Sequence, residues 1–506
     1  MQVGFQVLAD RYQIGLVQPL RAHSFIGNTR KIKEQPGLTE NIYPASYKPT
    51  DSFAGHFEFG LKYEEIHLEF FARLFQVVGP DPIVQWCRLS PLAQNARRAG
   101  FLFEWLTGQR LDVPDVAKGA YIDVVAEELY LTRVVPIRIK RWRINHNLPG
   151  TAAFCPLVRR TPELQMALRF DLNMALSDLN RNFGQDILMR TASWLTFKES
   201  RASFLIEREA DQADRIQRFA HVIAKYCGHI QAPLTETSLQ TLQKAILGHD
   251  AIGLGLRRSP VFVGQATMRE DIVHYIAPPF ERLPDLLQGL ETFEQCTRGA
   301  EPLARAAAVA FGFVYIHPMR DGNGRIHRFL INDVLLRDQA IPDGVILPIS
   351  ATITRSLDFR ARYDRTLEVF SRPLMQQYGH AHRFGDLVRY EDGTLSNFIF
   401  DNYEEALFAW RYPDLTEHVL YTAQVVEHTV RVEMVDEART LVVFQQARER
   451  LKEVVEMPDQ DANRIIRSLK ENGWEISGKL KKTYPQLAEG RRAAQVVEAV
   501  RSAFDE

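Results

Sequence analysis

The sequence predicts a mainly α-helical protein in three regions, with one small β-hairpin inside the central region. Much of the chain repeats apolar residues at helical spacing, as in the amphipathic segment Thr196–Cys227. By contrast, Gly253–Pro279 is rich in glycine and proline and holds two short β-type runs, 261–263 and Val273–Ile276. Short runs of this kind, separated by polar residues, indicate a hairpin rather than a helix.

The first region, residues 1–175, is expected to be a helical accessory region. Apolar residues recur at helical spacing over Tyr63–Val78 and Gln94–Thr107, and Asn147–Pro156 is rich in turn residues. The region carries no motif that assigns it a role.

The two remaining regions are also predicted to be helical. In residues 176–375, further helices are expected at Leu239–Leu247, Leu283–Cys296, Glu301–Tyr315 and Ile326–Arg337. In residues 376–506, they are expected at Tyr403–Trp410 and Asp414–Arg448, followed by three short helices around Gly473 and Gly478. These last helices are compatible with a helix-turn-helix-like unit.

The composition is that of an ordinary globular protein. Of 506 residues, 45% are hydrophobic, and 62 basic residues balance 63 acidic ones to a formal net charge of −1. This balance provides no overall attraction to nucleic acid or anionic lipid, and no segment approaches the roughly 18 apolar residues of a membrane span. Four widely spaced cysteines and a start without signal-peptide pattern lead us to expect a cytoplasmic protein that does not contact the membrane.

One segment, from His317 to Arg328, concentrates the chemistry of the central region. It reads His-Pro-Met-Arg-Asp-Gly-Asn-Gly-Arg-Ile-His-Arg. The preceding helix is expected to end here, because Pro318 disfavours helical backbone at the residue before it. Gly322 and Gly324 permit positive φ, and successive amides in such a turn can form an anion-binding nest.

The residues around this turn suit a polyphosphate. The next helix is expected to start near Gly324 or Arg325, which aims its free amides and positive dipole end into the loop. Arg325 and Arg328 share a helix face, and arginine forks suit phosphate oxygens. Asp321 can hold Mg²⁺ together with substrate phosphates. His317, with an ordinary pKa of about 6.5, suits a general base. The alternative is a plain glycine turn with its arginines in surface ion pairs.

This segment resembles the signature of the Fic family, His-Pro-Phe-x-Asp-Gly-Asn-Gly-Arg-x-x-Arg. It matches every fixed position except one, where Met319 replaces a phenylalanine expected to anchor the loop. Methionine is an adaptable apolar substitute. The resemblance is specific over about residues 196–375. It implies a Fic-type helical core with the hairpin as its flap, flanked by helical N- and C-terminal regions.

The resemblance also implies roles for individual residues. In the family, the motif histidine takes a proton from a target hydroxyl that attacks the α-phosphate of ATP, and His317 matches that position. By the same match, Asp321 would hold Mg²⁺, Arg325 would contact the phosphates and Arg328 would orient the γ-phosphate. The anion hole would be lined by Gly322, Asn323 and Gly324.

A family flap aligns a target segment by strand addition. The segment Val273–Pro279 resembles the end of that flap through its double proline and its distance to His317, and an ordinary connecting loop is the alternative. The first four residues of this segment are the candidate flap residues. They are Val273, His274, Tyr275 and Ile276.

A further family element is an inhibitory helix with the pattern Ser/Thr-x-x-x-Glu-Gly/Asn. Ser203 and Glu207 fit it and, four residues apart, face the same side of a helix. The resemblance implies that Glu207 pairs with Arg328 and excludes the productive γ-phosphate pose. Arg208 departs from the pattern, which leaves the tightness of this restraint open. A solvated acidic helix face is the alternative.

Together these expectations describe a protein adenylyltransferase that moves AMP from Mg-ATP to a Ser, Thr or Tyr hydroxyl, restrained by Glu207. The target protein would dock at the flap, and the chain itself is one candidate target. Three alternatives stay open: another nucleotide donor, removal of AMP as the main activity, and a regulatory module whose C-terminal region contacts DNA or protein. Acidic residues interleaved with the C-terminal lysines disfavour nucleic acid there.

Overall fold

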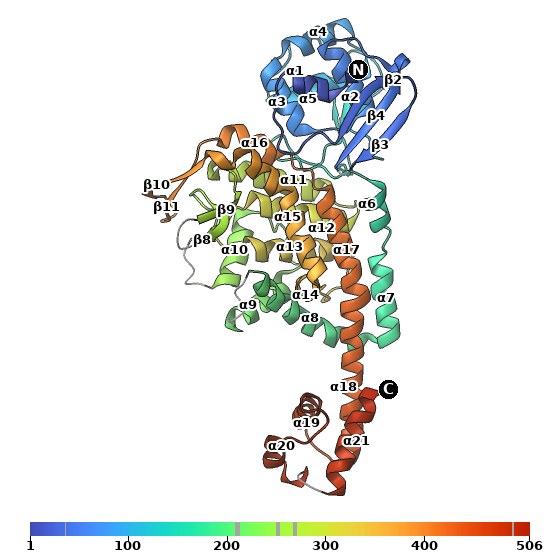
Figure 1. Ribbon diagram of the computed structural model, residues 1–506, viewed down its shortest axis with the longest axis vertical. Coiled ribbons are helices and arrows are strands. Elements are labelled where there is room, and N and C mark those ends of the chain that lie inside the picture. Colours follow the sequence, from blue (N-terminus) through green and yellow to red (C-terminus); the bar gives the residue numbers. More distant parts are fainter. Residues whose placement is uncertain (36, 208–212, 249–252, 267–270, 488–489, 506) are drawn as a thin grey trace.

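The computed structural model describes residues 1–35, 37–207, 213–248, 253–266, 271–487 and 490–505. Three bodies follow one another along an elongated molecule (Figure 1). A mixed module with the N-terminus lies at one end, a helical core lies in the middle, and a small helical unit lies at the far end of a long helix. Helices dominate, so the mainly α prediction is confirmed.

The N-terminal module packs helices against a sheet with strand order β1-β2-β4-β3, in which β2 and β4 are parallel. Its apolar core is rich in phenylalanine, with Phe5, Phe57 and Phe71 fully buried and in ring contact. The elements of the module are β1 (Gln2–Val3), α1 (Phe5–Arg11), β2 (Ala22–Gly27), β3 (Lys31–Gln35), β4 (Leu38–Pro44), η1 (Ala45–Tyr47), α2 (Phe53–Tyr63), α3 (Leu68–Val78), α4 (Asp81–Leu89), α5 (Gln94–Thr107), β5 (Ile122–Asp123), β6 (Ile137–Ile139) and β7 (Ile144–His146).

The strands of this module correct the expectation of a purely helical N-terminal region. All residues of β3 are exposed, and β2 and β4 each bury a single residue. Strands with so little burial lack the alternation of apolar and polar residues by which a strand is recognised. The helix expected at Gln94–Thr107 is present as α5, whereas the one expected at Tyr63–Val78 begins later, at Leu68.

The helical core is organised around α12, which α11, α13 and α17 surround. Nearly all of α12 is buried, because its alanines and Gly312 let the neighbouring helices approach closely. A Cβ at Gly312 would lie 2.8 Å from Cδ1 of Leu290. The helices of the core are α6 (Pro162–Ala167), α7 (Leu172–Phe183), α8 (Gln185–Ile206), α9 (Ala213–Tyr226), α10 (Glu236–Leu247), η2 (Phe280–Arg282), α11 (Leu283–Cys296), α12 (Pro302–Ile316), α13 (Asn323–Arg337), α14 (Ile349–Arg355), α15 (Leu357–Tyr378), η3 (Gly379–Ala381), α16 (Tyr403–Arg411) and α17 (Thr416–His428).

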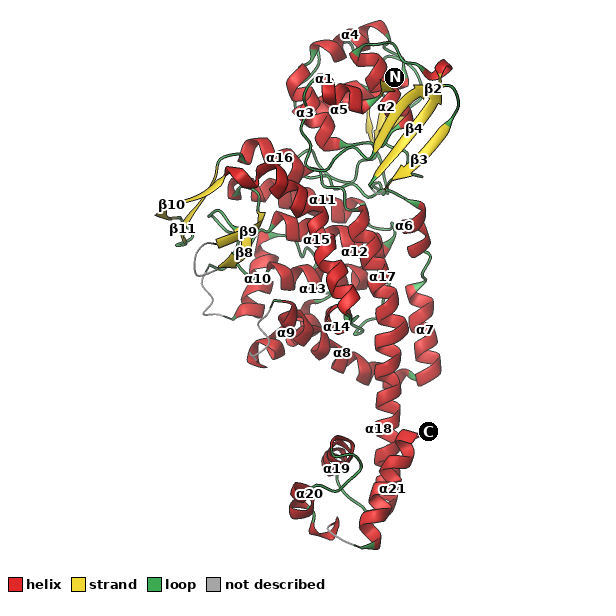
Figure 2. Ribbon diagram, viewed as in Figure 1, coloured by secondary structure: helices red, strands yellow, loops and turns green. Residues whose placement is uncertain are grey.

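Two hairpins lie at one side of the core (Figure 2). Antiparallel β8 (Phe262–Ala266) and β9 (Asp271–Ile276) form the hairpin that the sequence predicted. A second hairpin, β10 (His382–Arg389) with β11 (Leu395–Phe400), was not expected. It packs against the first through the Phe262 ring, which contacts the rings of Phe384 and Phe398.

The amphipathic segment Thr196–Cys227, for which the sequence predicts helical structure, does not form one continuous helix. Instead, α8 ends at Ile206, α9 begins at Ala213, and the two helices pack on each other. Arg208 lies outside the described residues. The sequence between the helices contains neither glycine nor proline, so no residue there signals a helix end.

The C-terminal unit is connected to the core by a nearly continuous helical segment. This segment comprises α17, the π-helical η4 (Thr429–Met434) and α18 (Val435–Val454). The three expected short helices are present as α19 (Asp459–Glu471), α20 (Gly478–Thr483) and α21 (Arg491–Asp505), with η5 (Pro485–Leu487) between the last two. They share a small apolar core with the end of α18. Over the described part of the chain, no helix combines the length and apolarity needed to cross a membrane.

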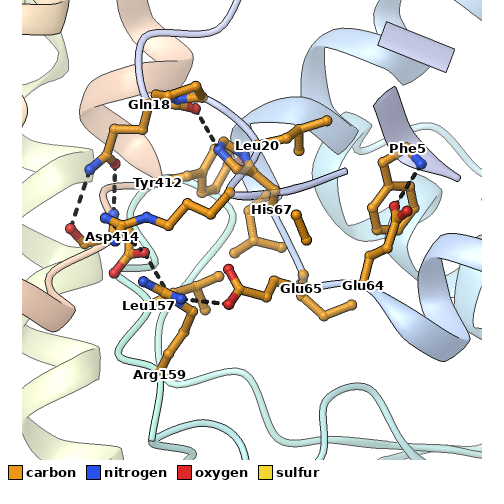
Figure 3. Close-up of a pocket in the computed structure, with 15 residues that line it drawn as sticks. Phe5, Gln18, Leu20, Glu64, Glu65, His67, Leu157, Arg159, Tyr412 and Asp414 are labelled. Atoms are coloured by element: carbon orange, nitrogen blue, oxygen red, sulfur yellow. Dashed lines mark hydrogen bonds and ion pairs between the residues drawn. The ribbon is translucent and has the colours of Figure 1, made fainter. Parts of the chain in front are cut away.

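A largely buried arginine, Arg159, whose side chain is 11% exposed, links the N-terminal module to the core (Figure 3). Arg159 donates from Nη1 to Glu65 of the module at 2.6 Å and from Nε to Asp414 at 3.0 Å. Gln18 accepts a hydrogen bond from the backbone N–H of Asp414 at 2.7 Å. Burial opposes ionisation of Asp414, but Arg159 and Arg21 outweigh it and lower its pKa to about 2. The two bodies are therefore joined by an ionised network.

Candidate active site

His317 caps the C-terminal end of α12 in a left-handed backbone conformation, with φ of 47° and ψ of 57°. Its N–H still donates to Phe313 at 3.0 Å, so the helix ends where Pro318 predicts. The ring nitrogen Nδ1 lies 3.3 Å from the carbonyl oxygen of Val314. A carbonyl only accepts hydrogen bonds, so Nδ1 carries the proton and Nε2 keeps its lone pair.

The electrostatic environment keeps this imidazole neutral. Burial is the main cause, and the positive charge of Arg257 adds to it, so that the pKa of His317 falls to about 4. Glu207 and Asp321 act in the opposite direction without reversing the shift. A neutral imidazole with a free lone pair at pH 7 can accept a proton.

A tight loop links His317 to α13. Gly322 has a φ of 93° and caps α13, which begins at Asn323, slightly earlier than expected. The Asn323 side chain accepts from the Met319 N–H at 3.0 Å and donates to the Met319 carbonyl at 2.7 Å. Met319 is fully buried. Asn323 therefore shapes the loop through its side chain, while the first N–H groups of α13 have no acceptor within the helix.

Asp321 stands at the mouth of this loop, with its side chain 53% exposed. Its Oδ1 accepts from the Gly322 N–H at 2.5 Å and from Arg325 Nη2 at 2.7 Å. One accessible carboxylate fits Mg²⁺, which takes one or two carboxylates and completes its shell with phosphate and water oxygens. Among the described residues, no group of three or more His, Cys, Asp or Glu side chains could hold a metal by protein ligands alone.

Arg328 is held by the end of α8. Its Nε donates to Ser203 Oγ at 2.7 Å, and its Nη2 donates to Glu207 Oε1 at 2.6 Å and to the Ser203 carbonyl at 3.2 Å. Burial disfavours the Glu207 carboxylate, yet Arg328 outweighs burial and holds the pKa of Glu207 below its ordinary value. The structure therefore brings Ser203, Glu207 and Arg328 together as an ionised, hydrogen-bonded group.

Glu207 also lies directly over the glycine turn. A Cβ built on Gly324 would lie 2.1 Å from Glu207 Oε1, so only glycine fits beneath the carboxylate in this arrangement. The carboxylate occupies space beside the first turn of α13, where an anion would be expected to bind.

Of the predicted flap residues, His274 is exposed and Val273 is half-buried. Tyr275 and Ile276 lie in the core, and the Tyr275 hydroxyl donates to the Tyr315 carbonyl. The side chains of Tyr275 and Ile276 thus fasten β9 to the core, and only backbone or outward-facing groups of this strand are open to a ligand.

Two residues of the site escaped the sequence analysis. Gln243 on α10 donates to the Asp321 carbonyl at 2.8 Å and accepts from the Gly255 N–H at 2.7 Å. Arg257 donates to the His317 carbonyl at 2.8 Å. Both act on the motif loop from distant sequence positions, through contacts with backbone that no local pattern encodes.

A third overlooked residue, Glu199, anchors α8. It is buried on the same helix as Ser203, and its carboxylate accepts from the N–H and hydroxyl of Ser350 on α14. Burial raises the pKa of Glu199 to about 7, although the Ser350 hydrogen bonds act against the shift.

Glu199→Gln is expected to abolish a pH dependence of stability. The folded-state pKa of Glu199 lies above the ordinary value of 4.5. The contribution of Glu199 to the free energy of unfolding is therefore fully present below pH 4.5 and is lost as the pH rises through about 7. From about pH 5 to about pH 8, the parent should lose about 1–3 kcal/mol of unfolding free energy relative to Glu199→Gln. Urea denaturation of both forms measures this difference. Parallel pH curves would contradict the assignment.

Comparisons with known proteins find similarity to Fic proteins in the central region of the chain. Residues 233–335 match the model of the Fic/DOC family. The chain is 31% identical over 157 residues to protein adenylyltransferase fic-1 of Caenorhabditis briggsae, and 30% identical to that of Caenorhabditis elegans. Each match covers 29% of this chain and 27% of the relative, so the chain matches about a quarter of their length.

A solved Fic family protein from Desulfovibrio desulfuricans is similar over a longer stretch at lower identity. The match covers 66% of this chain and 86% of that chain, with 18% sequence identity and a TM-score of 0.34.

Proposed function

We propose, from the premise that residues 233–335 form a Fic/DOC-family domain, that this chain is a protein adenylyltransferase that transfers AMP from ATP to a protein hydroxyl. The observation that carries the proposal is the pairing of a neutral His317, with its Nε2 lone pair available, with a glycine turn at the N-terminus of α13. The adenylyltransferase names of the two Caenorhabditis relatives support the same activity.

The proposed reaction follows from these groups. The hydroxyl oxygen of the target attacks the α-phosphorus of ATP, and its proton passes to Nε2 of His317. The bond from the α-phosphorus to the bridging oxygen of the β-phosphate breaks, and pyrophosphate leaves. The N–H groups of Gly322, Asn323 and Gly324 hold the phosphates, as does Arg325. Positioning and charge stabilisation are expected to supply most of the rate enhancement.

Asp321 is the residue proposed to hold Mg²⁺. When bound, the cation would neutralise phosphate charge next to the α13 N-terminus. Asp321 would then exchange its contact with Arg325 for the cation, which leaves the Arg325 guanidinium available to phosphate oxygens.

The inhibitory role of Glu207 belongs to the same proposal. Arg328, the residue expected to orient the γ-phosphate, donates to both Glu207 and Ser203 in this structure. ATP can bind productively only if Arg328 exchanges these partners for phosphate. The described conformation therefore corresponds to the restrained form.

Intact-protein mass spectrometry tests the reaction, the base and the restraint together. The parent, Glu207→Gly and Glu207→Gly/His317→Ala are incubated with Mg-ATP. We expect the mass of one AMP to be added in Glu207→Gly, less in the parent, and not in the double variant. Equal labelling of the parent and Glu207→Gly would reject the restraint, and labelling of the double variant would reject the base.

The remaining alternatives have their own readouts. If Glu207→Gly gains no AMP, a competition binding panel of ATP, GTP, UTP and CDP-alcohols identifies another donor. Release of AMP from a modified target, lost in Glu207→Gly, would instead favour removal as the main activity.

We further propose that the target protein docks at the β8–β9 hairpin and that the reaction takes place in the cytoplasm. Exposed strand positions such as Val263 and Ile272 support docking by strand addition. The four free cysteines are compatible with a reducing compartment. Nucleic-acid binding through residues 376–506 is the weaker alternative, and mobility-shift assays with and without that region separate the two.

A further inference from the structure

We infer that Arg257 is the positioning residue of the site, which fixes the backbone of His317 and ties both ends of the β8–β9 hairpin to it. The activity readout of this inference rests on the proposed function, whereas its spectroscopic readout does not.

Arg257 lies just before β8 and is 2% exposed. Its guanidinium donates to three backbone carbonyls: Nε to His317 at 2.8 Å, Nη1 to Ser259 at 3.1 Å and Nη2 to Pro278 at 2.7 Å. Its own N–H donates to the Pro318 carbonyl at 3.0 Å. The three acceptors belong to the motif loop, the chain entering β8 and the chain leaving β9.

This arrangement needs the shape of arginine. A guanidinium directs five donors from a rigid plane, so it can reach three separate segments at once. Lysine supplies a point charge with three donors at one nitrogen and cannot span the same carbonyls. Burial lowers the pKa of Arg257 to about 10, which leaves it charged at neutral pH. A buried cation is costly unless it is hydrogen-bonded, and here the hydrogen-bond partners are the parts of the site.

Arg257 contacts the backbone at His317, where the conformation is energetically unfavourable. His317 has a positive φ, which is unfavourable for residues other than glycine and persists only when the surroundings hold it. Arg257 donates to the carbonyls of His317 and Pro318, which belong to the two consecutive peptide groups that follow the His317 Cα. The imidazole direction depends on that backbone, so Arg257 acts on the base through its position.

The charge of Arg257 acts on the same residue. Among the described residues, three charged groups influence the pKa of His317 through their charge: Arg257, Glu207 and Asp321. Arg257 lowers the pKa of His317, and the two carboxylates raise it. Loss of Arg257 would therefore raise this pKa, whereas a lysine would largely preserve the charge and lose the geometry.

The test compares Arg257→Met and Arg257→Lys in the Glu207→Gly background. Misplacement of a reacting group by about 1 Å can cost about 10²-fold in rate, so we expect kcat to fall by about 10–100-fold in both variants. The KM for ATP should change little, because the phosphate contacts come from α13. The acid limb of the pH–rate profile should move to higher pH in Arg257→Met and stay in place in Arg257→Lys.

Arg258→Met is the matched control, since Arg258 is exposed and pairs with Glu391 at 3.1 Å. It should leave kcat and the pH profile unchanged. NMR titration of the His317 ring provides the readout that does not depend on turnover. A purely structural role would lower the melting temperature of Arg257→Met without moving the His317 titration.

The inference is overturned if Arg257→Met folds with unchanged kcat and an unchanged His317 titration. If Arg257→Met does not fold, Arg257→Lys decides, because retained kcat in that variant would reject the geometric role. If no form transfers AMP, Glu207→Gly included, the proposed function fails. The NMR signals of His317 still decide whether Arg257 controls the ring: the titration should move to higher pH in Arg257→Met, and in Arg257→Lys the ring chemical shifts should change at an unchanged pKa, whereas unchanged ring shifts in Arg257→Lys would reject the geometric role.

Discussion

His317→Ala is expected to lower the rate of AMP transfer by about 10²–10⁴-fold, the usual contribution of a positioned general base. The effect is measured in the Glu207→Gly background, in which Arg328 loses its Glu207 partner and is expected to become available to phosphate. Nε2 of His317 is the acceptor that the structure leaves with a lone pair, because Nδ1 donates to Val314. Single-turnover kinetics with excess enzyme isolates this step.

Two accompanying measurements separate a lost base from a damaged site. ATP affinity should be unchanged in His317→Ala, because its phosphate contacts are expected from Arg325, Arg328 and the α13 amides. With the pKa of His317 near 4, the rate of the Glu207→Gly form should stay flat at neutral pH and fall only as the pH drops toward that value. A midpoint near the ordinary histidine pKa of about 6.5 would contradict the buried, neutral imidazole.

The parts of this fold that the sequence predicts are those with a local signal. The helices from α10 to α13 have recognisable ends in the sequence, and their observed bounds agree with prediction within a few residues. The β8–β9 hairpin was recognisable from its short β-type runs. The strands of the N-terminal module were not, because β3 is fully exposed and its pairing partners are set by tertiary structure.

The residues of the candidate site also fall into two groups, those that the sequence predicts and those that only the folded structure reveals. The motif placed His317, Asp321 and the glycine turn correctly at a helix end and a helix start, since both depend on neighbouring residues. Gln243 and Arg257 act on the motif from other elements, so only the folded chain reveals them. Their partners are backbone carbonyls and N–H groups, which nearly every residue has, so the residue types in the sequence do not indicate these contacts.

The placement of Ser203 and Glu207 against Arg328 depends on more than the residue pattern of α8. The helix that presents these residues is fastened on two further sides, by Glu199 to α14 and by Lys198 to Glu437 of α18. Because α18 also carries the C-terminal unit, α8 contacts the element through which that unit joins the core. If Glu207 restrains the site as proposed, loss of that restraint would require either a change of partners at Arg328 or a movement of α8 relative to α14 and α18.

The largest expected loss of stability is at the junction of the N-terminal module. The Arg159 and Asp414 side chains are 11% and 20% exposed, so Arg159→Ala should lower the free energy of unfolding by an amount between the roughly 1 kcal/mol of an exposed pair and the roughly 3–5 kcal/mol of a fully buried one. The variant leaves the partly buried Asp414 with Arg21, at 3.6 Å, as its one remaining ion-pair partner among the described residues. Arg160→Ala is the matched control, because its pair with Glu301 is more exposed and should contribute at most about 1 kcal/mol.

The pH dependence of this loss identifies Asp414 as its cause. The folded-state pKa of Asp414 is lowered from 3.8 to about 2, so its stabilisation is present above 3.8 and disappears as the pH falls through about 2. The difference in unfolding free energy between the parent and Arg159→Ala should therefore be constant near neutral pH and shrink in acid. Calorimetry at a series of pH values measures it. A loss no larger than that of Arg160→Ala, or one that does not change in acid, would show that the module is held by its apolar contacts and not by this network.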